Sequence, residues 1–504
     1  MNIKEAKEEI KNTVKAYLRK DDVGNYRIPT VRQRPILLIG PPGIGKTAIV
    51  NQAANELGIG FVAYTMTHHT RQSAVGLPVL IKKEYEGETF TATEYTMSEI
   101  ISSVYECMER SGCREGLLFI DEINCVSETL IPTMLQFLQN KTFGAHKVPK
   151  GWVIIAAGNP QEYNHTAREF DIVTLDRVRM MDIKEDYEVW KEYAYGHNVH
   201  PAILSWLNMH PDRFYYVKDT GAEKHFVTAR GWEDLSVILQ SYEEMGIEDA
   251  YKVIPEYIRD PAIAGDFSSY YVLYRKYLQD YRIMEILQGS CSETKLQKLA
   301  CLAAKGNADE RLAVTGMIVD GWNTYFETYK RKSLIVRHLS DALEQWEHTE
   351  EGFHEWMEQR EKAFLVKSQA ELVAEEELTE EKFVQHVIRS CDQKIREIRC
   401  RKKEEMTEIL KSFWIAEKEK LSVCVQEVSA ALDRGFSFAE QAFGEGMELT
   451  LLTSDLLQNP SAAEFISKYG CDRYFAHSDV LFLEKERREI LDQAARLRAV
   501  RDDP

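Results

Sequence analysis

Short apolar runs alternate with stretches of helical spacing between Pro35 and about Asp182. The apolar runs predict strands at Ile36–Ile39, Phe61–Thr65, Leu117–Ile120 and Val153–Ala157. The helices between and after these strands are expected to begin near Lys46, Ser98 and Glu128. Near-continuous apolar strands that alternate with helices indicate a parallel sheet with helices on both faces. An N-terminal helix, from Lys4 to Leu18, is expected before the first strand.

After about Glu185 the apolar spacing is helical almost throughout. No proline occurs between Pro261 and Pro460, so this part of the chain is expected to form long helices. Aromatic residues at helical spacing, such as Trp346 and Trp414, must be buried either in a core of this region or against a partner, and we favour the first. With a boundary at Gly289, the chain divides into residues 1–185, 186–289 and 290–504.

An acidic stretch, Glu371–Glu381, is followed by a group of basic residues. The basic residues are Lys394, Arg396, Arg399, Arg401, Lys402 and Lys403. The two stretches could form two antiparallel helices or one long solvated helix. A nucleic-acid surface is disfavoured, because aromatic residues that could stack on bases are not interleaved with the basic ones.

The composition excludes several classes of protein. The 504 residues include 63 Lys and Arg against 81 Asp and Glu, which gives a net charge of −18. This charge disfavours a protein whose main task is to coat nucleic acid or an anionic membrane. The apolar runs are too short to span a bilayer, and the N-terminus does not resemble a secretory signal. We expect a cytoplasmic protein whose nine scattered cysteines are reduced, buried thiols.

The strand Ile36–Ile39 leads into a phosphate-binding motif of the form GxxxxGK[ST]. Its candidate ligand-binding residues are Gly40, Pro41, Pro42, Gly43, Ile44, Gly45, Lys46, Thr47 and Ala48. Glycines allow backbone N–H groups to turn inward around a phosphate, and the N-terminus of the following helix adds a partial positive charge. Lys46 is expected to neutralise the β- and γ-phosphates, and the Thr47 hydroxyl to coordinate Mg²⁺.

Two carboxylates, Asp121 and Glu122, directly follow the apolar strand Leu117–Ile120. Carboxylates at the end of a buried strand need a partner, and a magnesium ion near the phosphates would provide one for Asp121. Glu122 could then accept a proton from an attacking water. In isolation the pair could also be a helix N-cap, but after a phosphate-binding motif we interpret it as catalytic.

Asn159 follows the apolar strand Val153–Ala157. The carboxyl ends of parallel strands line the ligand crevice of an open sheet. We therefore expect Asn159 at the same edge as Lys46 and Asp121, where its amide could orient water or the γ-phosphate. The alternative is that Asn159 and Pro160 only form a turn.

These three motifs, in this order, resemble those of AAA+ ATPases, where they are called Walker A, Walker B and sensor 1. Two insertions make the chain similar to the helix-2-insert clade and to MoxR-like ATPases. Val79 to Thr96, with a turn at Glu86–Glu88, resembles the helix-2-insert hairpin, and Leu138–Pro149 resembles the pre-sensor-1 hairpin. The resemblance implies an α/β P-loop AAA+ core with a parallel sheet (1–185), an α-helical lid (186–289) and a largely helical C-terminal domain (290–504).

The resemblance extends to two arginines. Leu175–Arg179 is similar to the family segment whose arginine reaches the nucleotide of the next subunit, so Arg177 is the implied arginine finger. Arg179 is the second candidate, because Val178 stands where the family has phenylalanine. Arg230 corresponds to the sensor-2 arginine, although Ala229 replaces the usual proline.

The resemblance also implies a function. A MoxR-like protein would hydrolyse ATP with Mg²⁺ in a homo-oligomeric ring, a hexamer by resemblance, and would remodel or assemble a protein client, such as a protein with a von Willebrand factor A domain. One alternative is a nucleic-acid translocating or restriction-type NTPase, which the net charge disfavours. Another is a nucleotide-gated scaffold that binds nucleotide but hardly hydrolyses it.

Overall fold

The structure is a computed structural model. The residues that it describes are 1–66, 76–85, 88–126, 130–143, 146–163, 170, 172–219, 224–349, 352–369, 375–399 and 402–478. The chain forms two compact units. The first unit contains residues 1–189 and 349–392, and the second contains residues 190–348 and 393–504.

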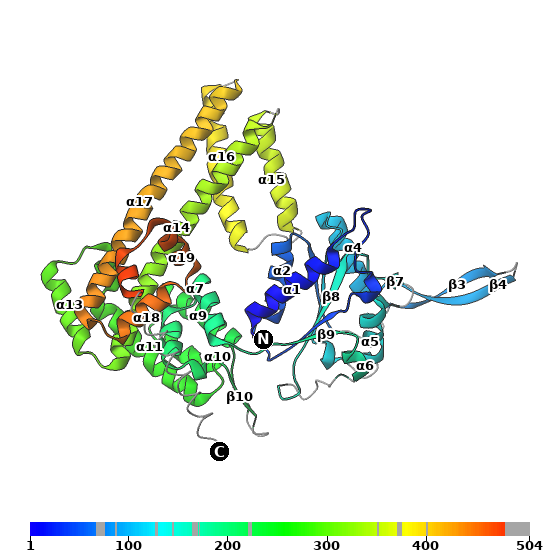
Figure 1. The fold of residues 1–504 in the computed structure, drawn as a ribbon, viewed down its shortest axis with the longest axis horizontal. Helices are drawn as coiled ribbons and strands as arrows, with labels where there is room; N and C mark the ends of the chain where they lie inside the picture. Colours follow the sequence, from blue (N-terminus) through cyan, green and yellow to red (C-terminus); the bar gives the residue numbers. More distant parts are fainter. Residues whose placement is uncertain are drawn as a thin grey trace, which may run out of the picture. The chain divides into compact units, whose positions relative to one another are not determined.

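A parallel five-stranded sheet forms the centre of the first unit (Figure 1). Its strands lie in the order β2-β5-β8-β1-β9. Their bounds are Ile36–Ile39 (β1), Gly60–Thr65 (β2), Gly116–Asp121 (β5), Trp152–Gly158 (β8) and Arg179–Asp182 (β9). The predicted parallel sheet and its four predicted strands are confirmed. The sequence did not reveal β9, because this edge strand has charged residues at both ends.

Helices cover both faces of the sheet, as the apolar strands predicted. On one face, Ile36 and Leu38 pack with α1 (Ile3–Leu18) and α2 (Lys46–Leu57). On the other face, Leu37 packs with α4 (Glu99–Ser111) and α5 (Ile131–Asn140). The expected helix starts at Lys46 and Ser98 are confirmed, since Ser98 is the N-cap of α4. The third helix begins at Ile131, and Glu128 lies outside the described residues.

Both expected hairpins are present. The first consists of β3 (Pro78–Tyr85) and β4 (Glu88–Tyr95), which extend away from the sheet as a two-stranded ribbon (Figure 1). The second consists of the short strands β6 (Thr142–Phe143) and β7 (His146–Lys147). Residues 86 and 87, in the expected turn of the first hairpin, lie outside the described residues.

Two helices from far along the chain complete the first unit. These are α15 (Phe353–Gln369) and α16 (Glu375–Ile398), the last residues of which belong to the second unit. Arg360 donates to both carboxylate oxygens of Glu381, and α15 also packs against α4. The acidic residues from 375 to 381 lie on α16 together with the basic residues Lys394 and Arg396, as in the alternative of one long helix. The helix is not fully solvated, because Val384 and Ile388 are buried.

The second unit is mainly helical. Its helices are α7 (Tyr187–Gly196), α8 (Pro201–Met209), α9 (Ala229–Glu244), α10 (Ile254–Tyr257), α11 (Pro261–Tyr281), α12 (Ile283–Gln288), α13 (Glu293–Lys305), α14 (Ala308–Glu347), α17 (Lys403–Phe443), α18 (Met447–Leu456) and α19 (Pro460–Tyr469). A hairpin of β10 (Tyr216–Asp219) and β11 (Lys224–Val227) interrupts the expected helical stretch before α9. The helical interpretation of this segment was therefore wrong. Tyr216 to Asp219 pair with Lys224 to Val227 as antiparallel strands.

One core joins the expected lid (186–289) to the helical region after it. Helix α14 packs against α8, α11 and α12 as well as against α17. Lys191 Nζ on α7 forms a buried ion pair with Asp455 Oδ1 on α18, at 2.6 Å. Gly289, which suggested a boundary, has a φ of 75° and caps the C-terminus of α12. It ends a helix inside this unit.

The cysteines only partly match the expectation. All eight in the described residues are free thiols, but only Cys107, Cys391 and Cys424 are buried, and Cys301 is exposed. None of the helices in the described ranges combines the length and the apolar character needed to cross a membrane.

Candidate functional site

The phosphate-binding motif forms the turn between β1 and α2, at the carboxyl edge of the sheet. Gly43 and Gly45 have φ values of 74° and 90°, in the left-handed region that glycine adopts without a steric penalty. Gly45 is the N-cap of α2, so the helix begins with Lys46 directly after this turn. The backbone N–H groups at the start of α2 have no partner within the helix and can bind an anion.

The Lys46 ammonium lies inside this turn and is largely buried. It donates hydrogen bonds to three oxygens, each at 2.8 Å: the carbonyls of Gly40 and Pro41 and Oδ1 of Asn159. The lysine therefore links the phosphate-binding turn to the end of β8. As an ammonium group with three donors, it can transfer these bonds to phosphate oxygens.

Thr47 and Asp121 meet at the ends of two different elements. The Thr47 hydroxyl donates to Oδ2 of Asp121 at 3.0 Å, and the other carboxylate oxygen accepts the backbone N–H of Glu122 at 2.9 Å. A hydroxyl and a carboxylate at this distance are hard oxygen ligands of the kind that Mg²⁺ prefers. The donor set fits a magnesium ion held mainly by a nucleotide and water, with these two side chains beside it.

Glu122 has an unusual backbone conformation. Its φ of 54° and ψ of 37° place it in the left-handed region, which costs a non-glycine residue free energy. It precedes the short 3₁₀ helix η2 (Ile123–Cys125) and follows β5 directly. The chain thus turns sharply at Glu122, next to the Thr47–Asp121 pair.

Asn124 is a residue of this site that sequence reasoning missed. Its side chain, on η2, donates to the Asn159 carbonyl at 2.7 Å and accepts the Asn159 N–H at 3.3 Å. A Cβ on Gly158 would lie only 2.6 Å from Asn124 Oδ1, so glycine allows this close approach. The sequence feature that could have identified Asn124 is its position as a polar residue between the apolar Ile123 and the pair Cys125 and Val126.

The two candidate arginine fingers differ in their surroundings. Arg179 opens β9, and its guanidinium donates to Thr13 Oγ1 and Glu9 Oε1 on α1. In the sheet it is paired with Ile36, at the amino end of β1 and therefore away from the phosphate-binding turn. Arg177 is exposed, and no described residue forms a hydrogen bond or ion pair with its side chain. Of the two, Arg177 alone has a guanidinium that no partner in the described chain engages.

Arg230 belongs to the second unit. It lies in the first turn of α9, is exposed, and is close enough to Glu233 to favour that carboxylate's ionised form. Burial is the larger effect on Glu233 and raises its pKa. Thr228 caps the helix by accepting the Gly231 N–H at 3.2 Å, so Ala229 does not leave the helix start without a cap.

The structure thus brings together most of the residues that the motifs singled out. Hydrogen bonds join Lys46 to Asn159 and Thr47 to Asp121, and Glu122 is adjacent to Asp121. Arg177 belongs to the same unit and follows α6 (Ile172–Leu175).

Part of the chain is similar to a known protein family. Residues 35–178 match a family model described as the AAA domain of the dynein-related subfamily, so this part of the chain is similar to that domain. The Lon protease of Endomicrobium trichonymphae is 22% identical over 258 residues, which are 48% of this chain and 28% of that protein. The chain therefore spans little more than a quarter of this relative's length.

A solved structure was also matched. A candidate ATPase from Cytophaga hutchinsonii covers 51% of this chain and 80% of its own, at 14% identity and a TM-score of 0.23.

Proposed function

We propose that this chain is a MoxR-like AAA+ ATPase, which hydrolyses ATP with Mg²⁺ at the interfaces of a ring and uses the resulting motion to remodel or assemble a protein client. The observation that carries the proposal is the hydrogen-bonded cluster of Lys46, Thr47, Asp121 and Asn159 at the carboxyl edge of the sheet. Phosphates bind at such an edge in α/β folds.

The roles of the side chains follow from their chemistry. Lys46 and the N-terminus of α2 would neutralise the phosphate oxygens, and Gly40 to Ala48 would surround them. Thr47 and Asp121 would hold Mg²⁺, which supplies positive charge to the transferring phosphoryl group. Glu122 would accept the proton of the attacking water, and Asn159 would orient that water or the γ-phosphate.

Action between subunits is supported by Arg177. An exposed guanidinium without a partner among the described residues is available to the phosphates of a neighbouring copy. A permanently charged group with several donors is suited to the charge that develops on a γ-phosphate. Arg230 would contribute in the same way from the lid. A homo-oligomeric ring, a hexamer by resemblance, is part of the proposal.

The client and the partner rest on the resemblance to MoxR-like proteins. The ribbon of β3 and β4 offers exposed apolar side chains for such contacts, including Leu80 and Phe90. A protein that carries a von Willebrand factor A domain is the partner class that we propose.

The first test is ATP turnover by the full chain. Lys46→Ala should abolish nucleotide binding, because the phosphates lose their cation. Glu122→Gln should bind ATP but lose turnover, because an amide cannot accept the proton. Glu109→Gln, the same change at an exposed site on α4, is the control and should leave turnover unchanged. Turnover by Glu122→Gln at the native rate would contradict the assignment of the base.

A further inference from the structure

Three connections lead into the adjacent strands β1, β5 and β8 at the amino edge of the sheet, opposite the phosphate-binding turn. They are residues 19–35, 112–115 and 141–151, and we call them the amino-edge surface. Nine of their residues are Lys or Arg and three are Asp or Glu, whereas the whole chain has 63 against 81. The charge of this surface is therefore opposite in sign to that of the chain.

Contacts between the connections hold this surface together. Tyr26 donates from its hydroxyl to Glu115 Oε1 at 2.8 Å, and Lys20 Nζ lies 2.6 Å from the same oxygen. A Cβ on Gly151 would lie 2.5 Å from the Tyr26 hydroxyl, so the third connection also approaches closely. Glu115, one of the three acidic residues, is thus already engaged by two groups of the surface itself.

Lys141 is a buried cation of this surface, with 7% of the residue exposed. Its bond within the described residues is a long one, from Nζ to Gln33 Oε1 at 3.4 Å, and no described carboxylate pairs with it. Burial lowers the pKa of Lys141 to about 8. An ammonium group has three donors, and its burial is costly unless an anion is near. The described chain does not provide that anion.

Most of the remaining cations are exposed, and no described residue forms a hydrogen bond or an ion pair with their side chains. Five of them are arginines, and a guanidinium can bind a carboxylate through two parallel hydrogen bonds. The exposed cations are Arg19, Arg27, Arg32, Arg34, Arg114, Lys147 and Lys150.

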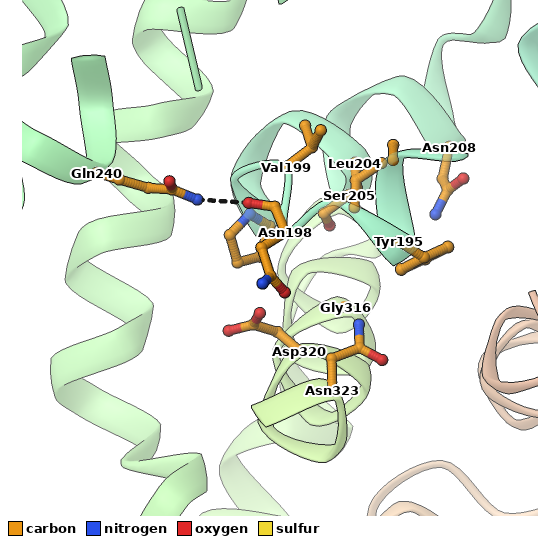
Figure 2. A pocket seen from close by; sticks show the side chains of 12 residues that line it. Tyr195, Asn198, Val199, Leu204, Ser205, Asn208, Gln240, Gly316, Asp320 and Asn323 are labelled. Carbon is orange, nitrogen blue, oxygen red and sulfur yellow. Dashed lines mark hydrogen bonds between the residues drawn. The ribbon is translucent and has the colours of Figure 1, made fainter. Parts of the chain in front are cut away.

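Polar groups inside the second unit are in a different situation. Figure 2 shows a cavity of about 90 Å³ that is lined by side chains of α7, α8, α9 and α14, among them Asp320. Two of its amide side chains bond within the unit. Gln240 donates to the Asn198 carbonyl at 2.6 Å, and Asn323 accepts from Asn459 at 2.9 Å. The chain itself satisfies these groups, whereas no described residue engages the exposed cations of the amino-edge surface.

We propose that the amino-edge surface binds an acidic segment of a partner protein. The segment would place carboxylates on the arginines and an apolar side chain on Val31, which is 92% exposed next to Arg32. The charge of the surface is complementary to such a segment, and its arginines match carboxylates in geometry.

Nucleic acid fits this surface less well. A single strand is bound through aromatic rings that stack on its bases, but Tyr26 is half-buried and Phe143 is buried. These two are the Phe, Tyr and Trp residues of the three connections. A long polyanion would also be repelled by the acidic excess in the rest of the chain, whereas a short acidic segment needs only the local charge.

The test is the fluorescence anisotropy of a labelled peptide rich in glutamate and leucine, titrated with the full chain in the absence of nucleotide. The peptide should bind, and its binding should weaken as salt is added, because exposed charges are screened. The triple variant Arg27→Gln, Arg32→Gln, Arg34→Gln should bind about 10-fold more weakly, because three exposed charge pairs are lost. Since no nucleotide is present, the outcome does not depend on the proposed ATPase activity.

The matched control is the triple variant Lys276→Gln, Lys298→Gln, Arg337→Gln, which loses the same charge at exposed positions of the second unit and should bind as the native chain does. Carbodiimide coupling, which joins peptide carboxylates to nearby amines, should modify Lys147 and Lys150. The proposal is overturned if the two triple variants bind alike, if coupling occurs mainly on the second unit, or if a DNA duplex binds more tightly than the peptide.

Discussion

At the scale of single residues, the position of Asn159 depends on Asn124. Asn124 holds both the N–H and the carbonyl of Asn159, whose side chain in turn accepts from Lys46. Asn124 also follows Glu122 by two positions, so it couples the loop of the proposed base to the loop of the proposed water-orienting residue. Its contribution is to position Asn159.

We therefore expect Asn124→Ala to bind nucleotide with nearly native affinity and to lose about 10- to 100-fold in kcat, because a small displacement of a catalytic group has a large effect on rate. Nucleotide affinity and turnover are to be measured separately. Asn140→Ala, at an exposed position at the end of α5, is the control. An unchanged kcat, or equal losses in kcat and in affinity, would show that Asn124 does not act through Asn159.

At the scale of elements, α14 and α17 pack closely through one tryptophan. Trp322 donates from Nε1 to the Ala431 carbonyl at 2.9 Å, and a Cβ on Gly435 would lie 2.5 Å from its ring. In an open helix, Gly→Ala raises stability by up to about 1 kcal/mol, because the unfolded chain becomes less flexible. At Gly435 the added methyl group must displace a buried ring.

We expect Gly435→Ala to lower the free energy of unfolding by roughly 1–3 kcal/mol, the usual cost of overpacking. Gly265→Ala, on α11, meets no atom within 4 Å and should instead stabilise the protein slightly. Denaturant unfolding of both variants checks the pair. Equal effects of the two substitutions would mean that the contact between α14 and α17 is looser than described.

At the scale of the whole molecule, the proposed activity requires more than one copy of the chain. Arg177→Ala should lower turnover by on the order of 10³-fold if Arg177 acts as an arginine finger. Mixing Arg177→Ala chains with Lys46→Ala chains should restore part of the activity, because some mixed interfaces contain both an intact arginine and an intact lysine.

Arg179→Ala is the control for this experiment, since its guanidinium is engaged by Glu9 and Thr13 of the same chain. Arg179→Ala is expected to lower the stability of the chain modestly. Mixing it with Lys46→Ala chains is not expected to change this effect. If the two inactive chains assemble together without any recovery of turnover, Arg177 does not act between subunits.

Local sequence pattern was enough to predict the parallel sheet and the residues that cluster at its edge. Gly40, Asp121 and Asn159 each stand at the carboxyl end of an apolar strand. In a parallel sheet these ends lie at one edge, so the local pattern was sufficient to group the three residues. The same reasoning located both hairpins of the first unit, because alternation around a turn is a local signal.

Which distant residues share an environment depends on how the helices and strands pack together. Three contacts join positions far apart in the chain. They are the bond from Arg179 to Glu9, the hydrogen bonds between Asn124 and Asn159, and the ion pair of Lys191 with Asp455. The same holds for residues 349–392, which belong to the first unit, and for Asp320 in its cavity. A helix carries the same amphipathic pattern whichever neighbour covers it, so periodicity predicts that a face is buried but not what it is buried against.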